Sequence, residues 1–293
     1  MTEVCPPAAR ARWHADALWQ QLEPLLPGLD VEIVARIGST NTELLSRVRS
    51  GMREADGALP ARGRRRADLQ PTLLVAERQT HGRGRLGRDW QSSAQASLTF
   101  SLALPLATQG AGDWSGLSLA VGVALADALE PARASAPRLL LKWPNDLWLG
   151  DDAMPAGGRK LGGILIETAA VGEQRVAVIG VGLNIHAQAA EGLSHGQASV
   201  DELDPAASPP AVLAQVALPL ATALRRFEAE GFSAFAAAFA RRDLLAGRAL
   251  RTEGASTLSG IGAGVDAQGA LCLRSADGTL HRVASGEVSV RPC

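Results

Sequence analysis

The spacing of hydrophobic residues divides this chain into helix-like and strand-like segments. In residues 213–227 an apolar side chain recurs every three or four positions, which predicts an amphipathic helix. Residues 114–130 are small, apolar and long enough for a buried helix. Shorter helices are expected within 10–30, from about residue 39 to Val48, and from Phe232. Strands are expected where apolar residues alternate or run together, at 31–37, 72–77, 97–104, 139–143, 161–168 and 175–185.

The pattern changes at two places. Residues 51–70 are rich in glycine, alanine and arginine with no apolar period, and we interpret them as a solvated loop. After Arg242 short alternating segments follow one another closely, with turn residues between them, which indicates a small β-barrel module. We therefore expect three parts, namely a helical arm at 1–30, a main region at 31–242 and a C-terminal module at 243–293.

Composition excludes several classes of protein. The chain has 293 residues, of which 29 are basic and 30 acidic, so its net charge of -1 argues against a general nucleic-acid or membrane-surface binder. No apolar run is long enough to span a membrane, and the first residues do not resemble a secretion signal. The three cysteines show no CxxC and the five histidines no metal-ligand spacing, which excludes a disulfide scaffold and a zinc site. We expect a cytoplasmic globular protein.

Lysine is nearly absent from this chain. Only Lys142 and Lys160 are lysines among the 29 basic residues. Codon bias explains the scarcity, but an ammonium is a compact point charge whereas a guanidinium is a wide planar fork. A chain that has drifted toward arginine is expected to keep lysine where the fork does not fit, so both lysines are candidate site residues.

A glycine- and arginine-rich loop occupies residues 82–88. Its glycines match the GxGxxG dinucleotide fingerprint, but no helix is expected after Gly87 and no acidic residue stands near the required distance. Its arginines can donate paired hydrogen bonds to carboxylate or phosphate. We interpret the loop as an anion-binding loop. The alternative is an arginine–glycine RNA-binding loop, which usually occurs as a repeated tract.

Three further segments carry candidate chemistry. Residues 142–146 end a strand at Pro144 and present an amide and a carboxylate beside Lys142. Residues 157–167 place glycines on both sides of Lys160, and residues 180–184 form a glycine-containing strand that ends at Asn184. Taken singly, each segment is equally compatible with ordinary turn chemistry.

Taken together, the motifs resemble those of bacterial biotin protein ligases in order and spacing. They are Ser39-Thr40-Asn41, Gln79-x-x-Gly82-Arg83-Gly84-Arg85-x-Gly87-Arg88-x-Trp90, Lys142-Trp143-Pro144-Asn145-Asp146 and Lys160-Leu161-x-Gly163-Ile164-Leu165-x-Glu167. Residues 286–291 resemble the closing strand of the family's C-terminal SH3-like domain. Bifunctional members carry a winged-helix DNA-binding domain before the first motif, whereas 38 residues precede Ser39 here. The resemblance is therefore to the monofunctional type, and DNA binding is not expected.

The resemblance implies an α+β fold and an ATP-dependent, AMP-forming ligase. The expected catalytic domain has a mixed β-sheet with flanking helices, the class II synthetase-like biotin ligase fold, and a small SH3-like β-barrel follows it. The expected reaction activates biotin with ATP and Mg²⁺ to biotinyl-5′-AMP, and then transfers biotin to a lysine of a biotin carboxyl carrier protein.

The resemblance also implies roles for individual residues. Lys160 and Arg85 are the expected catalytic residues. The expected biotin-binding residues are Ser39, Thr40, Asn41, Gln79, Gly82, Arg83, Gly84, Arg85, Lys160 and Gly163. The expected ATP-binding residues are Arg88, Trp90, Lys142, Asn145, Asp146 and Asn184, with Mg²⁺ carried by ATP and no resident metal.

Two alternatives stay open. A lipoate–protein ligase shares the catalytic fold, but the arginine loop and the C-terminal module argue against it. A biotin-responsive transcriptional repressor is a different class, against which the short N-terminus and the net charge of -1 argue.

Overall fold

A computed structural model describes residues 3–4, 11–57, 70–107, 114–131, 136–151, 153–154, 157–171, 174–188, 196–253, 257–284 and 289–292. The chain forms two compact units. The first comprises Met1–Ala107, Ile164–His186 and Ala207–Ala221, and the second comprises Thr108–Gly163, Ala187–Ala206 and Thr222–Cys293. No helix in these described stretches is long and apolar enough to cross a membrane.

The first unit is built on a mixed sheet. Its strands lie in the order β1 (Glu3–Val4), β2 (Asp30–Ile37), β3 (Thr72–Gln79), β6 (Ser97–Pro105) and β10 (Gln174–Asn184). The β2–β3 pair is parallel, and the pairs β1–β2, β3–β6 and β6–β10 are antiparallel. Strand β9 (Gly158–Val171) enters this unit at Ile164. The predicted α+β class with a mixed sheet is confirmed.

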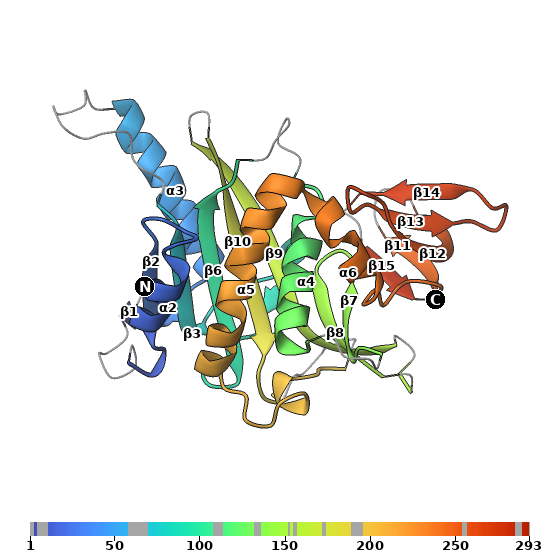
Figure 1. Cartoon of the computed structure of the whole chain (residues 1–293), viewed down its shortest axis with the longest axis horizontal. Coiled ribbons are helices and arrows are strands. Elements are labelled where there is room, and N and C mark those ends of the chain that lie inside the picture. The colour runs from blue at the N-terminus through green and yellow to red at the C-terminus, as the bar shows by residue number, and fades with distance from the viewer. Residues whose placement is uncertain are drawn as a thin grey trace. The chain divides into compact units, whose positions relative to one another are not determined.

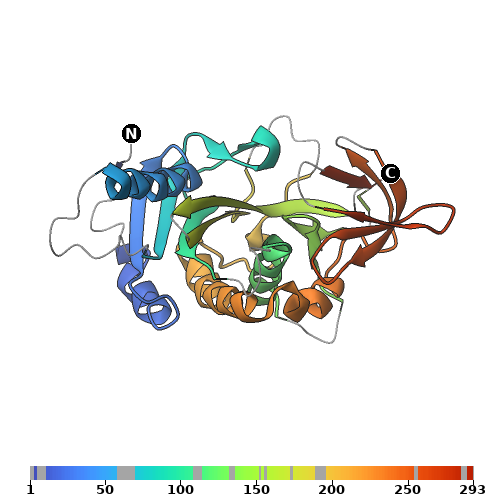
Figure 2. The same cartoon turned by 90° about the horizontal axis from the view of Figure 1, so that it is seen from above.

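Two helices cover the strands of the first unit. Helix α2 (Ala15–Leu22) packs on β2, and α3 (Thr40–Gly57) packs across β3, β6 and β10. In Figure 2 these two helices, in the two blue shades, lie on opposite sides of the blue strands. The core beneath α3 is made of its own apolar residues and those of the strands: Val34, Ile37, Leu44, Leu45, Val48, Leu74, Ala76, Ala103, Val176 and Val178.

The prediction that a loop begins at residue 51 was wrong for its first part. Helix α3 continues beyond Val48 to Gly57. Good helix formers can extend a helix without an apolar period, and Met, Arg, Glu and Ala occupy positions 52–55. The rest of the arginine-rich stretch, residues 58–69, lies outside the described residues.

The arginine loop forms a small antiparallel hairpin in the first unit. Strands β4 (Gly82–Arg83) and β5 (Asp89–Trp90) pair with Gly82 opposite Trp90, and a 3₁₀ turn, η1 (Arg85–Gly87), connects them. No helix follows Gly87 before β6 in the described stretch 88–97. This geometry confirms that the loop is not a dinucleotide-binding turn, since such a turn requires a helix N-terminus at that point.

The second unit holds a smaller antiparallel group of strands. Strand β7 (Leu139–Lys142) pairs with β8 (Asp146–Gly150), which pairs in turn with the first residues of β9. Helix α4 (Leu117–Leu129) packs on β7 and β8. The sequence did not predict β8, because only Leu147, Trp148 and Leu149 separate the polar turn from Gly150. That run is too short to show a period.

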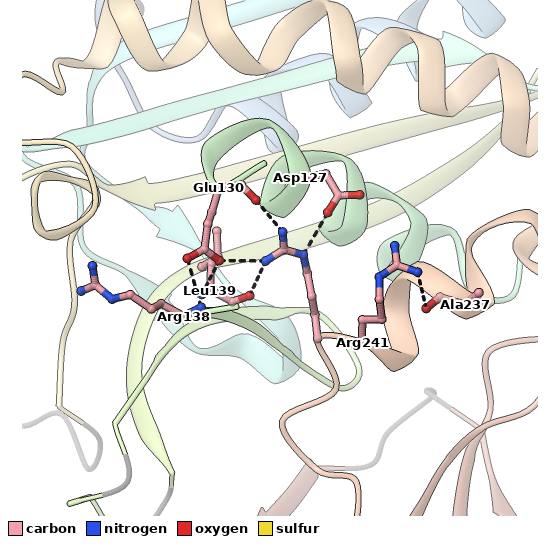
Figure 3. Close-up of polar contacts among 7 residues, drawn as sticks. Asp127, Glu130, Arg138, Leu139, Ala237 and Arg241 are labelled. Atoms are coloured by element: carbon pink, nitrogen blue, oxygen red, sulfur yellow. Dashed lines mark hydrogen bonds and ion pairs between the residues drawn. The ribbon is translucent and has the colours of Figure 1, made fainter. Parts of the chain in front are cut away.

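Two helices, a 3₁₀ turn and the buried Arg242 precede the C-terminal strands in the chain. Helix α5 (Pro209–Glu230) is followed by η3 (Phe232–Phe235) and α6 (Ala236–Ala240). Arg242 is buried and donates to Asp127 Oδ1 (2.9 Å), Glu130 Oε2 (3.0 Å) and the Leu139 carbonyl (2.8 Å). In Figure 3 the Glu130 carboxylate also accepts from the backbone N–H groups of Arg138 and Leu139, at 3.0 and 2.9 Å. These several partners satisfy the buried charge of Arg242. Since they belong to the end of α4 and the start of β7, Arg242 holds these two elements together.

The C-terminal strands form an antiparallel sheet in the second unit, drawn in red in Figure 1. The strand order is β14 (Leu280–Val283), β13 (Leu271–Arg274), β12 (Ser259–Val265), β11 (Ala249–Glu253) and β15 (Ser289–Pro292). The predicted run of short strands is therefore confirmed. Residues 285–288, which include the first half of the predicted closing motif, lie outside the described residues, and its second half lies in β15.

Candidate active site

Two polar groups contain six of the sixteen candidate site residues. The first, which we call the amide network, consists of Thr40, Asn41, Gln79, Ser101 and Glu167 in the first unit. Helix α3 begins at Thr40, and the Thr40 backbone N–H and hydroxyl both donate to Gln79 Oε1, at 2.7 and 3.1 Å. Gln79 thus satisfies one of the free N–H groups at the start of the helix, as a capping side chain does.

Asn41 is fixed by hydrogen bonds at both ends of its amide. Its Nδ2 donates to the Leu165 carbonyl and to Glu167 Oε2, each at 3.1 Å. Its Oδ1 accepts from Ser101 Oγ at 2.6 Å. Asn41 and Ser101 are both buried, so these bonds decide the orientation of the amide.

A glycine makes room for this network. Gly180 on β10 lies opposite Ser101 on β6. A Cβ at Gly180 would lie 2.3 Å from Asn41 Oδ1, which no real side chain allows. The Gly180–Ser101 pair therefore supplies both the space and the hydrogen-bond donor that Asn41 requires.

Arg83 of the arginine loop is held against the same network. Its Nη1 and Nη2 donate to the two carboxylate oxygens of Glu167 at 3.3 and 3.0 Å, and Nη1 also donates to Thr42 Oγ1 at 3.2 Å. Glu167 is therefore shared between Arg83 and Asn41. The chain itself provides one anion for a loop that the sequence predicts to bind anions.

The remaining candidate residues of the first unit lie in this hairpin, beside the start of α3 and at the end of β10. Ser39 accepts weakly from the Thr42 N–H, at 3.4 Å. Gly82 must be glycine because a Cβ would lie 2.4 Å from the Trp90 carbonyl, and the Trp90 ring covers Gly182 equally closely. Asn184 ends β10 and is buried. Gly84, Arg85 and Arg88 lie in the hairpin, where the Gly84 N–H donates to the Arg88 carbonyl at 2.7 Å.

The second group, which we call the lysine site, consists of Lys142, Asp146 and Lys160 in the second unit. Lys160 Nζ donates to Asp146 Oδ1 at 2.8 Å. Lys142 lies opposite Asp146 in the β7–β8 pair, and its buried Nζ is 4.7 Å from the centre of the Trp148 ring. Both lysines of the chain therefore lie close to Asp146. Lys160 is hydrogen-bonded to it, and Lys142 is its partner in the β7–β8 pair.

Two glycine features complete the lysine site. A Cβ at Gly163 would lie 3.4 Å from both Lys160 Nζ and Asp146 Oδ1, so this glycine leaves the pair open on one side. The loop that carries Asn145 begins at Trp143, whose buried Nε1 donates to the Gly269 carbonyl at 3.0 Å. A turn of the C-terminal sheet thus fixes the candidate nucleotide loop.

A buried carboxyl group lies beside this loop. Asp243 pairs with Leu141 in a β-bridge, and its Oδ1 accepts from the Leu245 N–H at 2.9 Å. Its Oδ2 is buried and makes no hydrogen bond within the described part of the chain. Burial raises the pKa of Asp243 to about 6, and the backbone N–H groups of Leu245 and Ala246 oppose that rise.

Acidic groups suited to a resident metal are absent from the described residues, where no cluster of three or more His, Cys, Asp or Glu could hold an ion. Asp146 offers a single carboxylate beside Lys160. Mg²⁺ in nucleotide sites is usually bound by one or two carboxylates together with substrate phosphates. Asp146 is therefore compatible with Mg²⁺ that arrives with a nucleotide.

The structure brings the predicted residues together in two sets. Thr40, Asn41, Gln79 and Arg83 share partners in the first unit, and Lys142, Asp146, Lys160 and Gly163 do so in the second. Sequence reasoning missed Ser101, and it included Glu167 in a family motif without giving it a role. The signal for Ser101 was the polar series at 97, 99 and 101, which gives one face of an otherwise apolar strand hydroxyl groups.

Comparison with known proteins identifies the family. Residues 64–184 match the biotin/lipoate A/B protein ligase family, and residues 249–291 match the biotin protein ligase C-terminal domain. The chain is 34% identical over 279 residues to the biotin–[acetyl-CoA-carboxylase] ligase of Mycobacterium tuberculosis, covering 92% of this chain and 89% of that protein. It is 32% identical to the bifunctional ligase/repressor BirA of Escherichia coli, covering 93% of this chain and 77% of BirA.

A solved structure shows the same fold. The biotin protein ligase of Aquifex aeolicus, in complex with biotin and ATP, superposes with a TM-score of 0.68 at 24% identity, covering 90% of this chain and 99% of that one. The resemblance that the motifs indicated is confirmed along nearly the whole chain. This chain belongs to the biotin protein ligase family.

Proposed function

We propose that this biotin protein ligase acts in two steps. In the first, a carboxylate oxygen of biotin attacks the α-phosphate of ATP, an O–P bond forms, and pyrophosphate leaves. In the second, the amine of an acceptor lysine attacks the carbonyl carbon of biotinyl-5′-AMP, an amide bond forms, and AMP leaves with the electrons of the broken C–O bond. Neither step requires a covalent bond to the enzyme.

The contact between Lys160 and Asp146 carries this proposal. The first step brings together two anions, so the protein must supply positive charge at the reacting atoms. Lys160 provides a compact ammonium on a side chain that is a third exposed, and the Cα of Gly163 adds no side chain beside it. We propose that Lys160 bridges the biotin carboxylate and the α-phosphate, and that it stabilises the departing phosphate in the second step.

The amide network fits the recognition of biotin. The ureido ring of biotin offers two N–H donors and one carbonyl acceptor, which neutral hydroxyl and amide groups can match. We propose that Ser39, Thr40, Asn41 and Gln79 bind this end of biotin. The loop residues Gly82, Arg83, Gly84 and Arg85 would cover biotin and the adenylate, with Arg85 donating to the phosphate.

The proposed nucleotide-binding residues combine charged and amide side chains with the aromatic ring of Trp90. We propose that Arg88, Trp90, Lys142, Asn145, Asp146 and Asn184 bind ATP, and that Asp146 is the carboxylate nearest to its Mg²⁺. The ion would neutralise phosphate charge. The support for this part is the pairing of Asp146 with Lys160 and the buried position of Lys142 on the Trp148 ring.

The acceptor is proposed to be the biotin carrier domain of a carboxylase, since a relative of this chain is named for acetyl-CoA carboxylase. We also propose that residues 31–242 form the catalytic domain and 243–293 a C-terminal domain, with residues 1–30 as an arm. The two family matches, at 64–184 and 249–291, support that division. We expect the reaction to occur in the cytoplasm, where ATP is available.

One experiment tests both steps. Purified protein is incubated with biotin and MgATP, biotinyl-5′-AMP is detected by mass spectrometry, and an acceptor carrier domain is then added. We expect the adenylate first and a single biotinylated lysine afterwards. Activation of lipoate in preference to biotin would favour the lipoate ligase alternative, and absence of any adenylate would refute the proposal.

A further inference from the structure

A short segment of the second unit is bound along the backbone of Lys160. The Lys160 N–H donates to the Gly196 carbonyl, and the Lys160 carbonyl accepts from the Ala198 N–H, each at 2.9 Å. Lys160 and Gln197 form a parallel β-bridge through these bonds. Both backbone groups of the proposed catalytic lysine are therefore held by residues 196–198.

The neighbouring arginine fastens the same segment by its side chain. Arg159 donates from Nη1 to Glu202 Oε1 at 3.0 Å and from Nη2 to Glu202 Oε2 at 2.6 Å. Arg159 Nη1 also donates to the Gln197 carbonyl at 3.1 Å. This paired arrangement matches the planar guanidinium to the carboxylate and fixes direction as well as distance.

Glu202 is fixed by the segment itself. It accepts from the Ser199 N–H at 3.1 Å, as part of a capping box on the 3₁₀ turn η2 (Val200–Glu202). The hydrogen bond from Arg159 is the main cause that lowers the pKa of the Glu202 carboxyl, against the opposing effect of burial. Glu202 is therefore ionised at neutral pH and stays paired with Arg159.

A glycine permits the close approach of Arg159. A Cβ at Gly196 would lie 2.7 Å from Arg159 Cγ and 3.0 Å from Cδ. The stem of Arg159 thus crosses directly over the segment that binds Lys160. Three independent features, namely the backbone bonds, the paired guanidinium and the glycine, join residues 196–202 to the start of β9.

We propose that Arg159 and Glu202 are positioning residues for adenylate formation, which rests on the role of Lys160 in the proposed function. The pair holds residues 196–202 against β9 and so keeps the Lys160 backbone where its ammonium reaches Asp146 and the substrates. Neither side chain contacts the reacting atoms. Displacement of a catalytic group by about 1 Å can lower a rate on the order of a hundredfold, so even partial loosening is measurable.

The test compares this pair with a matched ion pair elsewhere. Glu202→Gln removes the charge of the carboxylate, and Arg159→Lys keeps the positive charge but loses the fork. The control is Glu228→Gln, since Glu228 pairs with Arg225 at 2.7 Å and both pairs have side chains that are 23–32% exposed. Biotinyl-adenylate formation is measured in a single turnover, together with the dissociation constant of biotin and the thermal midpoint.

We expect Glu202→Gln and Arg159→Lys to slow adenylate formation roughly tenfold, with biotin affinity within about twofold of wild type. The double variant is expected to be no slower than the slower single variant, because both residues act through one contact. Glu228→Gln should match wild type. Gly196→Ala, which displaces Arg159 but keeps both charges, is expected to cause a smaller loss in the same step.

A spectroscopic readout separates positioning from general stability. The chain has two lysines, so protein labelled with ¹³C at the lysine ε-carbon gives two side-chain signals, which Lys142→Arg assigns. We expect Glu202→Gln to shift or broaden the Lys160 signal and leave the Lys142 signal unchanged, whereas Glu228→Gln affects neither.

The outcomes are distinguishable. Equal rates in Glu202→Gln, Arg159→Lys and the control would overturn the positioning role and leave the proposed function intact. Loss of rate in proportion to unfolding, or an unchanged Lys160 signal, would also overturn it. If wild-type protein forms no biotinyl-adenylate, the proposed function and this inference fail together.

Discussion

The amide network and the lysine site are built on opposite principles. In the amide network, Thr40, Asn41 and Ser101 are neutral, almost fully buried and fixed by hydrogen bonds to one another. In the lysine site, Lys160 and Asp146 are charged, and their side chains are 33% and 20% exposed. Neutral groups can be satisfied permanently inside the fold, whereas a charge that must meet a substrate has to stay near solvent. The neutral groups of the amide network are thus part of the core of the first unit, whereas the charged groups of the lysine site are partly exposed.

The largest test of this contrast is Lys160. We expect Lys160→Ala to reduce adenylate formation on the order of 10²–10³-fold, because one donor that stabilises developing charge is lost. Lys160→Arg should also be impaired, since the fork cannot take the position of a point charge. First-turnover kinetics measure both, with the thermal midpoint as control for folding. Wild-type turnover in Lys160→Arg would contradict the inference that this chain keeps lysine where a guanidinium does not fit.

Arg85 places a positive charge in the hairpin loop of the first unit. We expect Arg85→Gly to make biotinyl-adenylate but to release it about 10–100 times faster, because a charge-assisted contact to phosphate is worth roughly 1.5–3 kcal/mol. Free adenylate acylates exposed lysines. The measurement is labelling of an unrelated lysine-rich protein in the same tube. Labelling confined to the carrier domain, with adenylate synthesis verified, would contradict a role for Arg85 in retention.

Gly180 tests whether the neutral network tolerates displacement. We expect Gly180→Ala to weaken biotin binding about tenfold and to reduce the free energy of unfolding by about 1–3 kcal/mol, because the new Cβ overlaps the Asn41 amide. Titration calorimetry and denaturant unfolding measure the two effects. The matched control is Gly38→Ala, since a Cβ at Gly38 meets nothing within 4 Å. If both variants bind biotin alike, the geometry of Asn41 is irrelevant to binding.

The smallest expected effect is a pH-dependent change in stability at Asp243, the buried carboxyl group beside the candidate nucleotide loop. Burial raises the pKa of Asp243 to about 6, above its ordinary value of 3.8, so the fold favours the protonated form. Its stabilising contribution is complete below about pH 4 and is lost as pH rises through 6. Asp243→Asn mimics the protonated form, and we expect it to raise the free energy of unfolding on the order of 1 kcal/mol at pH 8 and by nothing near pH 4. Denaturant unfolding at both pH values measures this, and an equal effect at both would contradict it.

Much of the fold could be predicted from periodicity. Helix α5 followed from apolar residues every three or four positions, and the strands flanking the amide network followed from apolar runs. The extension of α3 to Gly57 and strand β8 could not be predicted. Residues 51–57 show no apolar period, and a five-residue strand is too short to display one.

The site was predictable as motifs but not as partners. The sequence indicates Lys160 because lysine is scarce in this chain, and it indicates Asp146 because a turn and a family motif place a carboxylate beside Lys142. The two roles remain predictions. The contacts that fix them join residues distant in sequence, such as Asn41 with Glu167 and Arg159 with Glu202, which lie 126 and 43 positions apart. No local pattern reports such a pairing, because it depends on strand order and on where glycine allows side chains to approach.

The hydrogen bond from Trp143 to Gly269 has a consequence for the nascent chain. Gly269 is synthesised 126 residues after Trp143, and at about 5–20 residues per second this takes roughly 6–25 seconds. Glu167, the last residue of the amide network, is added 24 residues into that interval, whereas the loop between Lys142 and Asp146 lacks the carbonyl that holds its indole until the interval ends. A ribosome-bound chain therefore has every residue of the amide network before the hydrogen bond that holds the Trp143 indole can form, and translation orders these two events in time.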